Sequence, residues 1–246
     1  MTAQVAPPLA PRARLRWAVV RRIVTDLAPT TILELGCGLG GVGVRLAAMA
    51  RYTAVEPDDR SFTVAYSRIA PLGDVIHGDH NKVPDGGTYD LVCAFEVLEH
   101  IADDAAVLAE WLPLVRPGGH VLLSVPADPE RFGRWDVLVG HHRRYTEEQL
   151  RRRLAEAGAV DISVRHYGWP LGYLLDSVRN VLSGSEVDGA PESAEARTTA
   201  SGRRFQPNSR LLGAAVSVGV APFVLLQRMR PGVGPGLVAV ARRPAG

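Results

Sequence analysis

Residues 34–56 contain a glycine-rich run flanked by two carboxylates, a combination that can bind a nucleotide. Glu34 precedes the glycines of 36–43, and Glu56 follows Gly36 by 20 residues. Glycines let a loop turn sharply and approach a ligand closely, and the first turn of a following helix offers free N–H groups. A carboxylate at the spacing of Glu56 can accept hydrogen bonds from both ribose hydroxyls. These residues therefore predict a site for a nucleoside.

The glycines alone fit two classes of nucleotide. Gly36, Gly38 and Gly41 satisfy the GxGxxG pattern of dinucleotide-binding loops. Glu34, however, lies in an apolar run, where a buried carboxylate is costly unless it meets a partner. The ammonium group of an amino-acid moiety is such a partner, usually reached through water, whereas a pyrophosphate would be repelled. Arg45 is the only basic residue of the loop and the helix after it, which also disfavours a pyrophosphate.

An acid also follows the third predicted strand. Asp79 stands between Gly78 and His80, where its carboxylate can accept a hydrogen bond from the amino group of an adenine. Together with the two glutamates, this residue indicates a ligand that joins an adenosine to an amino acid.

Acid–base side chains follow the fourth predicted strand, 89–95. Glu96, Glu99 and His100 lie at its carboxyl end, the edge at which open α/β sheets bind ligands. If a helix begins there, these three residues share one face. A reaction at an alcohol, phenol or amine benefits from a general base, and His100 is the preferred candidate.

A second polar cluster, from Trp135 to Tyr145, follows the fifth predicted strand and should lie over the same edge of the sheet. Its role can be to shape an acceptor pocket, with His141 and Tyr145 as polar contacts. A purely structural role, in which Arg143 and Arg144 pair with acids, fits the sequence equally well. Both interpretations stay open at this point.

Apolar runs predict the elements that position these side chains. Strands are expected at 31–35, 52–55, 74–77, 89–95, 120–125, 161–167 and 237–241. Helices are expected at 12–27, 45–49, 58–69, 103–115 and from a capping box at Thr146 and Gln149 to Gly158. Strands that alternate with helices of this size predict a parallel sheet covered on both faces, a Rossmann-like doubly wound α/β fold.

The segment 170–232 departs from this alternation. A helical apolar stripe spans 171–182, a run rich in Ser, Gly, Ala, Glu and Thr at 183–204 indicates a flexible linker, and 211–226 is nearly uncharged. The last run is shorter than the roughly 20 residues that a membrane span needs. We interpret 170–232 as a helical and flexible insertion, either buried against the sheet or an apolar lid that contacts a membrane surface. Residues 12–246 then form one domain, preceded by a loose arm at 1–11.

Composition excludes some classes of protein. The formal net charge is +2 and no basic stripe is present, so nucleic acid is not an expected partner. Cys37 and Cys93 form no CxxC pair, which favours free thiols and a reducing cytoplasm. The N-terminus has no apolar run of the kind that follows the basic part of a signal peptide. The oligomeric state is left open.

In combination, these motifs resemble the class I S-adenosylmethionine (SAM)-dependent methyltransferase family, of the bacterial small-molecule type. The matching runs are ILELGCGLG, AVEPD, HGD, YDLVCAFEVLEHI and LVRPGGHVLLSVP, and the run GHHRRY is similar to one common in that type. The resemblance covers roughly residues 12–167. It implies a seven-stranded sheet of order 3-2-1-4-5-7-6, with an antiparallel strand seven at 237–241 after an insertion that follows strand six.

The resemblance also implies a cofactor, SAM, and the residues that hold it. They are Glu34, Gly36, Gly38, Gly40, Glu56, Asp79, His80, Phe95 and Glu96. The glycines would line the methionine part with Glu34 beneath it, Glu56 would bind the ribose, and the pair at 79–80 would flank the adenine. The remaining pair, 95–96, would close the site. The implied reaction is methyl transfer to a small-molecule or lipid-like acceptor, at oxygen.

Two other functions fit the same fold. A nicotinamide-dependent oxidoreductase is one, although Lys82 is the only lysine and excludes a YxxxK site. A non-catalytic SAM-binding protein is the other, and it would combine an intact nucleotide side with an occluded acceptor side. Glu34 and Asp79 on the nucleotide side favour SAM over a dinucleotide. The polar residues of the acceptor side, His100 and 141–145, favour a methyltransferase over a non-catalytic protein.

The run ExxEH at 96–100 resembles the metal-binding pattern of ubiquinone-pathway O-methyltransferases and small-RNA 2′-O-methyltransferases. His141 or His142 would then complete a divalent site of carboxylates and imidazoles. Many relatives with EVLEH need no metal, so none is expected here.

Overall fold

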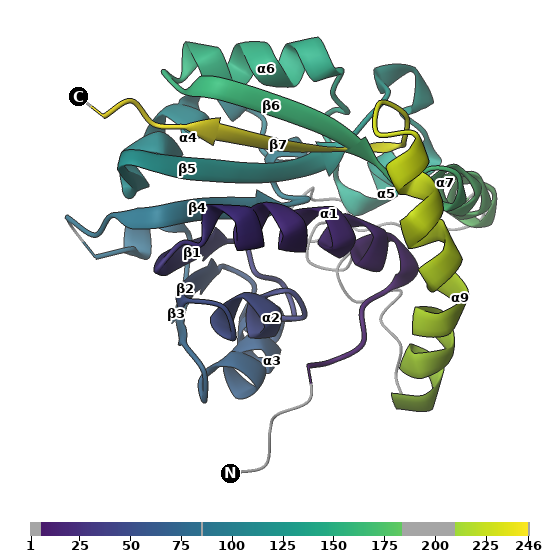
Figure 1. Ribbon diagram of the computed structural model, residues 1–246, viewed down its shortest axis with the longest axis horizontal. Coiled ribbons are helices and arrows are strands. Elements are labelled where there is room, and N and C mark those ends of the chain that lie inside the picture. The colour runs from purple at the N-terminus through teal and green to yellow at the C-terminus, as the bar shows by residue number, and fades with distance from the viewer. Residues whose placement is uncertain (1–5, 85, 184–209, 246) are drawn as a thin grey trace.

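A seven-stranded sheet in the order β3-β2-β1-β4-β5-β7-β6 forms the centre of the protein (Figure 1). The structure, a computed structural model, describes residues 6–84, 86–183 and 210–245. Strand β7 runs antiparallel to β5 and β6, and the other neighbours pair in parallel. The expected strand order and the antiparallel last strand are therefore confirmed. The strands are β1 Thr31–Leu35, β2 Arg51–Glu56, β3 Asp74–His77, β4 Tyr89–Phe95, β5 Val115–Pro126, β6 Val160–Tyr167 and β7 Gly236–Arg242.

Eight α-helices of the described residues connect or cover these strands. Their bounds are α1 Pro11–Leu27, α2 Gly43–Ala47, α3 Asp59–Ile69, α4 Asp104–Trp111, α5 Arg134–Val139, α6 Glu147–Glu156, α7 Leu171–Leu182 and α9 Arg210–Met229. Short 3₁₀ turns are η1 His80–Lys82, η2 Leu98–His100, η3 Leu112–Leu114 and η4 Pro129–Arg131. The predicted capping box is present, because Thr146 accepts from the N–H of Gln149 and Gln149 accepts in return.

The helix predicted over 103–115 ends earlier than expected. Helix α4 stops at Trp111, the 3₁₀ turn η3 follows, and β5 begins at Val115. Pro113 lies inside η3 and has no N–H to donate to the preceding turn of an α-helix, so the α-helical pattern cannot continue through it.

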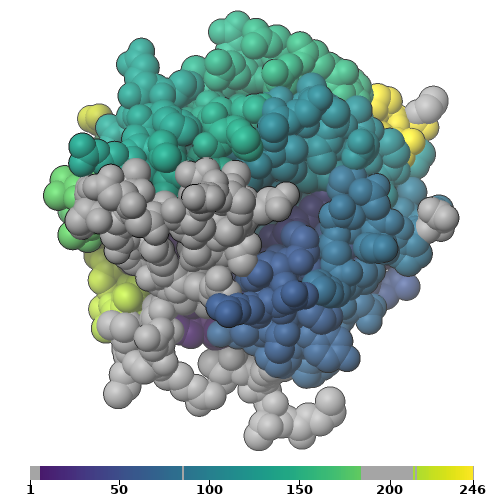
Figure 2. Space-filling view, turned by 180° about the vertical axis from the view of Figure 1, so that it is seen from behind, coloured from purple at the N-terminus to yellow at the C-terminus, as the bar shows by residue number. Residues whose placement is uncertain are grey.

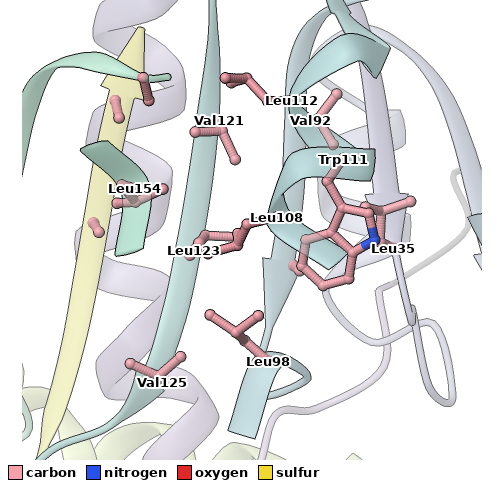
Figure 3. Close-up of a cluster of buried hydrophobic side chains, with 14 of the residues drawn as sticks. Leu35, Val92, Leu98, Leu108, Trp111, Leu112, Val121, Leu123, Val125 and Leu154 are labelled. Carbon is pink, nitrogen blue, oxygen red and sulfur yellow. The ribbon is translucent and has the colours of Figure 1, made fainter. Parts of the chain in front are cut away.

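The two faces of the sheet bury separate apolar clusters. Along β1, Leu33 and Leu35 face the cluster under α4 and α6, while Ile32 faces the one under α1, α2 and α3. This alternation follows from the two-residue period of a strand. Trp111 lies in the first cluster, beside Leu35 and Leu108 (Figure 3). Both faces are thus filled, and the ends of the strands are left for a ligand.

The helical insertion lies between β6 and β7, as predicted, and contributes α7 and α9. Helix α9 packs along α1, where the Gln227 amide donates to the Leu15 carbonyl at 3.1 Å and accepts from the N–H of Gly168 at 2.9 Å. No helix of the described residues is long and apolar enough to cross a membrane. Apart from Ser183, the linker predicted over 183–204 lies outside the described residues.

The prediction of a loose arm at 1–11 is wrong for its second half. Leu9 is buried, and the Arg45 guanidinium donates to the Pro7 carbonyl at 2.8 Å. Pro11 already belongs to α1. The packing of Leu9 and the hydrogen bond between the Pro7 carbonyl and Arg45 hold this segment in place. Residues 1–5 lie outside the described part of the chain.

Candidate functional site

A cavity of about 1030 Å³ opens at the carboxyl ends of the parallel strands. Figure 2 shows the surface hollowed between the blue and the teal parts of the chain, with purple atoms of the N-terminal part deep inside. This volume is at the upper end of the usual range for ligand pockets, so it suits two ligands side by side. The sequence-predicted residues that line it are Glu34, Gly36, Gly38, Glu56, Asp79, His80, Phe95, Glu96, His100 and His141.

The glycine loop after β1 has a conformation that other residues rarely adopt. Gly36 has a φ of +74°, and a Cβ there would lie 2.8 Å from a methyl group of Val97. Gly40, which was expected to line the ligand site, packs against α3 instead, where a Cβ would meet Ile69 and Ala65. It does not line the cavity, whereas Gly41 does. The structure thus places Gly40 against α3 and Gly41 at the cavity.

Glu34 lies at the inner end of the cavity with 2% of its surface exposed. Its carboxylate accepts a hydrogen bond from the Tyr52 hydroxyl of the neighbouring strand. Burial raises the pKa of Glu34 to about 7, against the opposing effects of Tyr52 and Arg16. A cationic ligand group beside this carboxylate would favour its ionised form. Sequence reasoning missed Tyr52, since only the pairing of β1 with β2 brings the two residues together.

Glu56 closes the other side of the glycine loop. One carboxylate oxygen accepts from the Gly38 N–H at 2.6 Å and the other from the Asp58 N–H at 3.0 Å. Burial raises the pKa of this buried carboxyl, while the two backbone hydrogen bonds oppose the shift. The carboxylate is thus held in place at the end of β2 before any ligand arrives.

Asp79 and His80 lie at the far end of the cavity, after β3. The Asp79 carboxylate accepts from the Asn81 N–H at 3.0 Å and caps η1. His80 Nε2 lies 2.6 Å from a Glu110 oxygen, and its ring meets Trp111 edge-on. Both contacts come from α4, so the fourth helix orients the histidine toward this end.

Glu96 follows β4 and is the most heavily paired acid of the site. Its carboxylate lies 3.3 Å from Arg16 and 3.8 Å from Arg12, and it accepts from Ser124 and Tyr167 at 3.1 Å each. Burial opposes its ionisation, but the two arginines lower the pKa of Glu96 to about 2. Sequence reasoning missed these arginines, which line the cavity from α1.

The helix expected to begin at Glu96 is absent. Glu96 has a φ of +58°, in the left-handed region, and only a 3₁₀ turn from Leu98 to His100 follows. Glu96 and His100 therefore do not share a helix face. The backbone turns instead so that the glutamate reaches α1 and the histidine reaches the loop after α5.

Glu99, His100 and His141 form a cluster beside the cavity. The His141 Nδ1–H donates to Asp136 at 2.7 Å, and its Nε2 lies 3.8 Å from Glu99. The rings of His100 and His141 meet edge-on, 4.7 Å between centroids. Burial, with repulsion from His141, lowers the pKa of His100 to about 3. At neutral pH the His100 imidazole is therefore neutral and a weak base.

This cluster has the donor set of a divalent-metal site. One ligand atom from each of Glu99, His100 and His141 lies within 4.8 Å of the others. Glu99 is 0% exposed, and neither of its carboxylate oxygens has a hydrogen-bond partner among the described residues. Such a group is costly to bury unless a cation or a donor meets it. Glu96, the other acid of the ExxEH run, is paired with arginines instead.

The structure corrects the role expected for Tyr145. Its side chain is 2% exposed and does not line the cavity, and its hydroxyl donates to Asp104 at 2.9 Å. The neighbouring arginines pair with acids, Arg143 with Asp104 and Arg144 with Asp136. Tyr145 and Arg143 thus make contacts of the structural kind, whereas Arg144 pairs with Asp136 and also lines the cavity.

We expect Tyr145→Phe to lower the free energy of unfolding by about 1 kcal/mol, the net value of one hydrogen bond, and to leave kcat unchanged. Asp104 keeps its contact with Arg143 in this variant, so its carboxylate is not left without a partner. Chemical denaturation and steady-state kinetics measure the two quantities. A large loss of kcat in a variant of normal stability would indicate that Tyr145 acts in the acceptor pocket.

The fold and the cavity define an α/β protein in which acids at the ends of neighbouring parallel strands share one cavity with an acid–base cluster. Residues 11–164 match the profile of a family described as a methyltransferase domain. The chain belongs to the class I SAM-dependent methyltransferase family.

Curated relatives match a little under half of the chain. A protein of Mycolicibacterium smegmatis named "probable S-adenosylmethionine-dependent methyltransferase" is 34% identical over 115 residues, 46% of this chain and 44% of that protein. A ubiquinone biosynthesis O-methyltransferase of Thiobacillus denitrificans is 30% identical over 117 residues, 45% of this chain and 49% of that protein. The match spans about half the length of these relatives.

Solved structures of low sequence identity share the fold. The N-methyltransferase NodS of Bradyrhizobium japonicum, in complex with S-adenosylhomocysteine, has a TM-score of 0.54 at 17% identity, covering 95% of this chain and 87% of that one. The phosphoethanolamine N-methyltransferase 2 of Haemonchus contortus has a TM-score of 0.57 at 17% identity, covering 93% and 53%. At such identities the likeness concerns the fold alone.

Proposed function

We propose that this protein transfers the methyl group of SAM to an oxygen atom of a small-molecule or lipid-like acceptor. The observation that carries the proposal is that one cavity joins the acids after β1, β2 and β3 to the acid–base cluster after β4 and β5. Methyl transfer from a sulfonium is an in-line displacement, which depends mainly on holding the methyl group and the nucleophile in line. A single continuous cavity serves that purpose.

In this proposal, each residue of the cofactor end contacts a different part of SAM. Glu56 accepts the ribose hydroxyls, and Glu34 faces the ammonium group of the methionine part. Asp79 and His80 lie at the adenine end, beyond the ribose. Because these acids follow three neighbouring strands, the cofactor lies across the edge of the sheet with its methyl group toward β4. Phe95 then closes the wall between the two ends.

His141 replaces His100 as the proposed general base. Asp136 accepts from its Nδ1–H at 2.7 Å, which fixes the tautomer and leaves Nε2 to accept a proton. Hydrogen bonds from His141 and Arg144 lower the pKa of Asp136 to about 2 despite burial, so it stays ionised. An ionised partner stabilises the imidazolium that forms when the acceptor hydroxyl loses its proton.

A divalent cation on Glu99, His100 and His141 is the second candidate for activating the acceptor. The observation that favours it is the buried Glu99 carboxyl, whose two oxygens have no hydrogen-bond partner in the part of the chain that the structure describes. Such a cation, when bound, would lower the pKa of an acceptor hydroxyl. Its ligands would be one carboxylate and two imidazoles, a set typical of Mn²⁺ or Zn²⁺.

The lipid-like alternative for the acceptor rests on the insertion. Helix α7 exposes Leu174, Val178, Val181 and Leu182, which are spaced to form a stripe along one helix face. Arg179 of the same helix lines the cavity. An apolar surface next to the cavity suits an acceptor that resides in a membrane surface, so peripheral membrane contact is part of this proposal.

The experiment supplies the protein with an extract of its host and with SAM that carries an isotopic label on the methyl group. We expect a labelled product one methylene heavier than its precursor. If the protein binds SAM without catalysing a reaction, no labelled product forms. Separate analysis of the lipid and the aqueous fractions decides between a lipid-like and a water-soluble acceptor. The proposed function is wrong if the protein binds S-adenosylhomocysteine but labels neither fraction.

A further inference from the structure

We infer that Tyr52 is a positioning residue of the cofactor site and makes the site selective for adenosyl ligands that carry an amino-acid ammonium group. This inference rests on the proposed function, in which Glu34 faces the ammonium group of SAM. Tyr52 does not line the cavity, and it acts through the Glu34 carboxylate, which accepts a hydrogen bond from its hydroxyl. The choice of ligand thus depends on a side chain that lies behind the wall of the cavity.

The pairing of β1 with β2 brings these two side chains to the same face of the sheet. Tyr52 pairs with Ile32 in the parallel register, and Glu34 follows Ile32 by two residues. Side chains two residues apart on a strand share a face. The partner of Glu34 in this register is Ala54, two residues beyond Tyr52. A side chain at position 52 therefore needs the length of a tyrosine to reach the carboxylate.

Packing holds the Tyr52 ring in this place, since its residue is only 2% exposed. Gly43, the first residue of α2, leaves room for it, because a Cβ there would lie 2.5 Å from the hydroxyl oxygen. Gly73, before β3, also lies against it, and a Cβ there would lie 3.2 Å from a ring carbon. Burial and the charge of Glu34 raise the pKa of Tyr52 well above its usual range, so the hydroxyl stays protonated and donates.

The hydroxyl influences the charge that Glu34 presents to a ligand. Burial raises the pKa of Glu34 to about 7, and the charge of Glu56 adds to this rise. The hydrogen bond from Tyr52 and the charge of Arg16 oppose it. Arg16 is itself paired with Glu96 at 3.3 Å. The hydroxyl, in contrast, contacts the Glu34 carboxylate directly and stabilises its ionised form.

Two thiols also face this carboxyl and carry no charge. Burial, with the charge of Glu34, raises the pKa of Cys37 and of Cys93 well above the usual range of a thiol, so both stay protonated. An ammonium group that binds here must displace the proton of Glu34 whenever the carboxyl is neutral. Because the Tyr52 hydroxyl favours the ionised form, it lowers the pH above which the carboxylate is available to the ligand.

The test compares S-adenosylhomocysteine with 5′-methylthioadenosine, which has the same adenosyl group but no ammonium group. Calorimetry with the full chain measures the ratio of the two affinities, in which effects on the shared adenosyl part cancel. In the wild type, we expect the preference for S-adenosylhomocysteine to fall about tenfold from about pH 8 to about pH 6, because Glu34 then gains a proton that the ammonium group must displace.

Tyr52→Phe should lower this preference at neutral pH by at least about tenfold, the effect of one hydrogen bond to a charged group. It should also shift the fall of the preference to higher pH, because the ionised form of Glu34 has lost a donor. The affinity for 5′-methylthioadenosine should stay the same. Glu34→Gln should remove the pH dependence of the preference. Tyr66→Phe, at an exposed tyrosine of α3, is the matched control and should behave as the wild type.

The outcomes separate this inference from the proposed function. A wild-type protein that binds neither compound contradicts the proposed function itself. A Tyr52→Phe variant with the preference and the pH dependence of the wild type overturns the inference alone. Equal losses of affinity for both compounds also overturn it, because they show an effect on the whole site. If Tyr52→Phe does not fold, Gly43→Ala takes its place with the same expected results, since its Cβ would displace the hydroxyl.

Discussion

Replacement of Glu56 by alanine is expected to lower the affinity for SAM by at least about tenfold. The carboxylate would accept two hydrogen bonds from the ribose, each worth roughly 1.5–3 kcal/mol when one partner is charged. It also accepts from the backbone N–H groups of Gly38 and Asp58, so the variant loses the group that holds the glycine loop against β2. Calorimetry with SAM and with S-adenosylhomocysteine measures the loss.

Two variants control this experiment. Glu56→Gln keeps the shape of the side chain but only one acceptor oxygen, and its affinity should fall between those of the wild type and the alanine variant. Asp26→Ala removes an exposed acid at the end of α1 and should bind SAM normally. Unchanged SAM affinity in a folded Glu56→Ala protein would remove Glu56 from the cofactor site.

Replacement of His141 by asparagine is expected to lower kcat by roughly 10²- to 10⁴-fold, the usual contribution of a general base. Affinity for S-adenosylhomocysteine should stay the same, because His141 lies at the acceptor end of the cavity. Asp136→Asn should lower kcat too, since Asp136 accepts from the His141 Nδ1–H. His120→Asn, in the middle of β5 and outside the cavity, is the control and should retain activity.

Chelation distinguishes the two ways in which His141 can act. If it is a general base, activity survives exhaustive chelation and elemental analysis finds no metal in the protein. If it is a ligand of a divalent cation, chelation lowers activity, Mn²⁺ or Zn²⁺ restores it, and Glu99→Gln is as inactive as His141→Asn. A His141→Asn variant with normal kcat would contradict both roles.

The sequence by itself predicted most of the elements and the residues that meet at the proposed cofactor end. Strands follow from apolar runs and glycine breaks, and the start of α6 from Thr146 and Gln149, because these signals depend on residues close together in the chain. The glycine loop, Glu34 and Glu56 stand at the ends of neighbouring strands, so a parallel sheet brings them to one edge whatever the rest of the chain does. The strand order came with the family resemblance and agrees with the structure.

Tertiary structure decided the acceptor end. Arg12 and Arg16 are 80 or more residues away from Glu96 in the chain, yet they set its charge state. Burial made His100 a weak base and placed Tyr145 outside the cavity. Ionisation and accessibility depend on what surrounds a side chain in three dimensions, and those neighbours come from α1, α4 and the loop after α5. Spacing along the chain therefore identified the candidates at this end, and packing between distant elements set their burial and their charge.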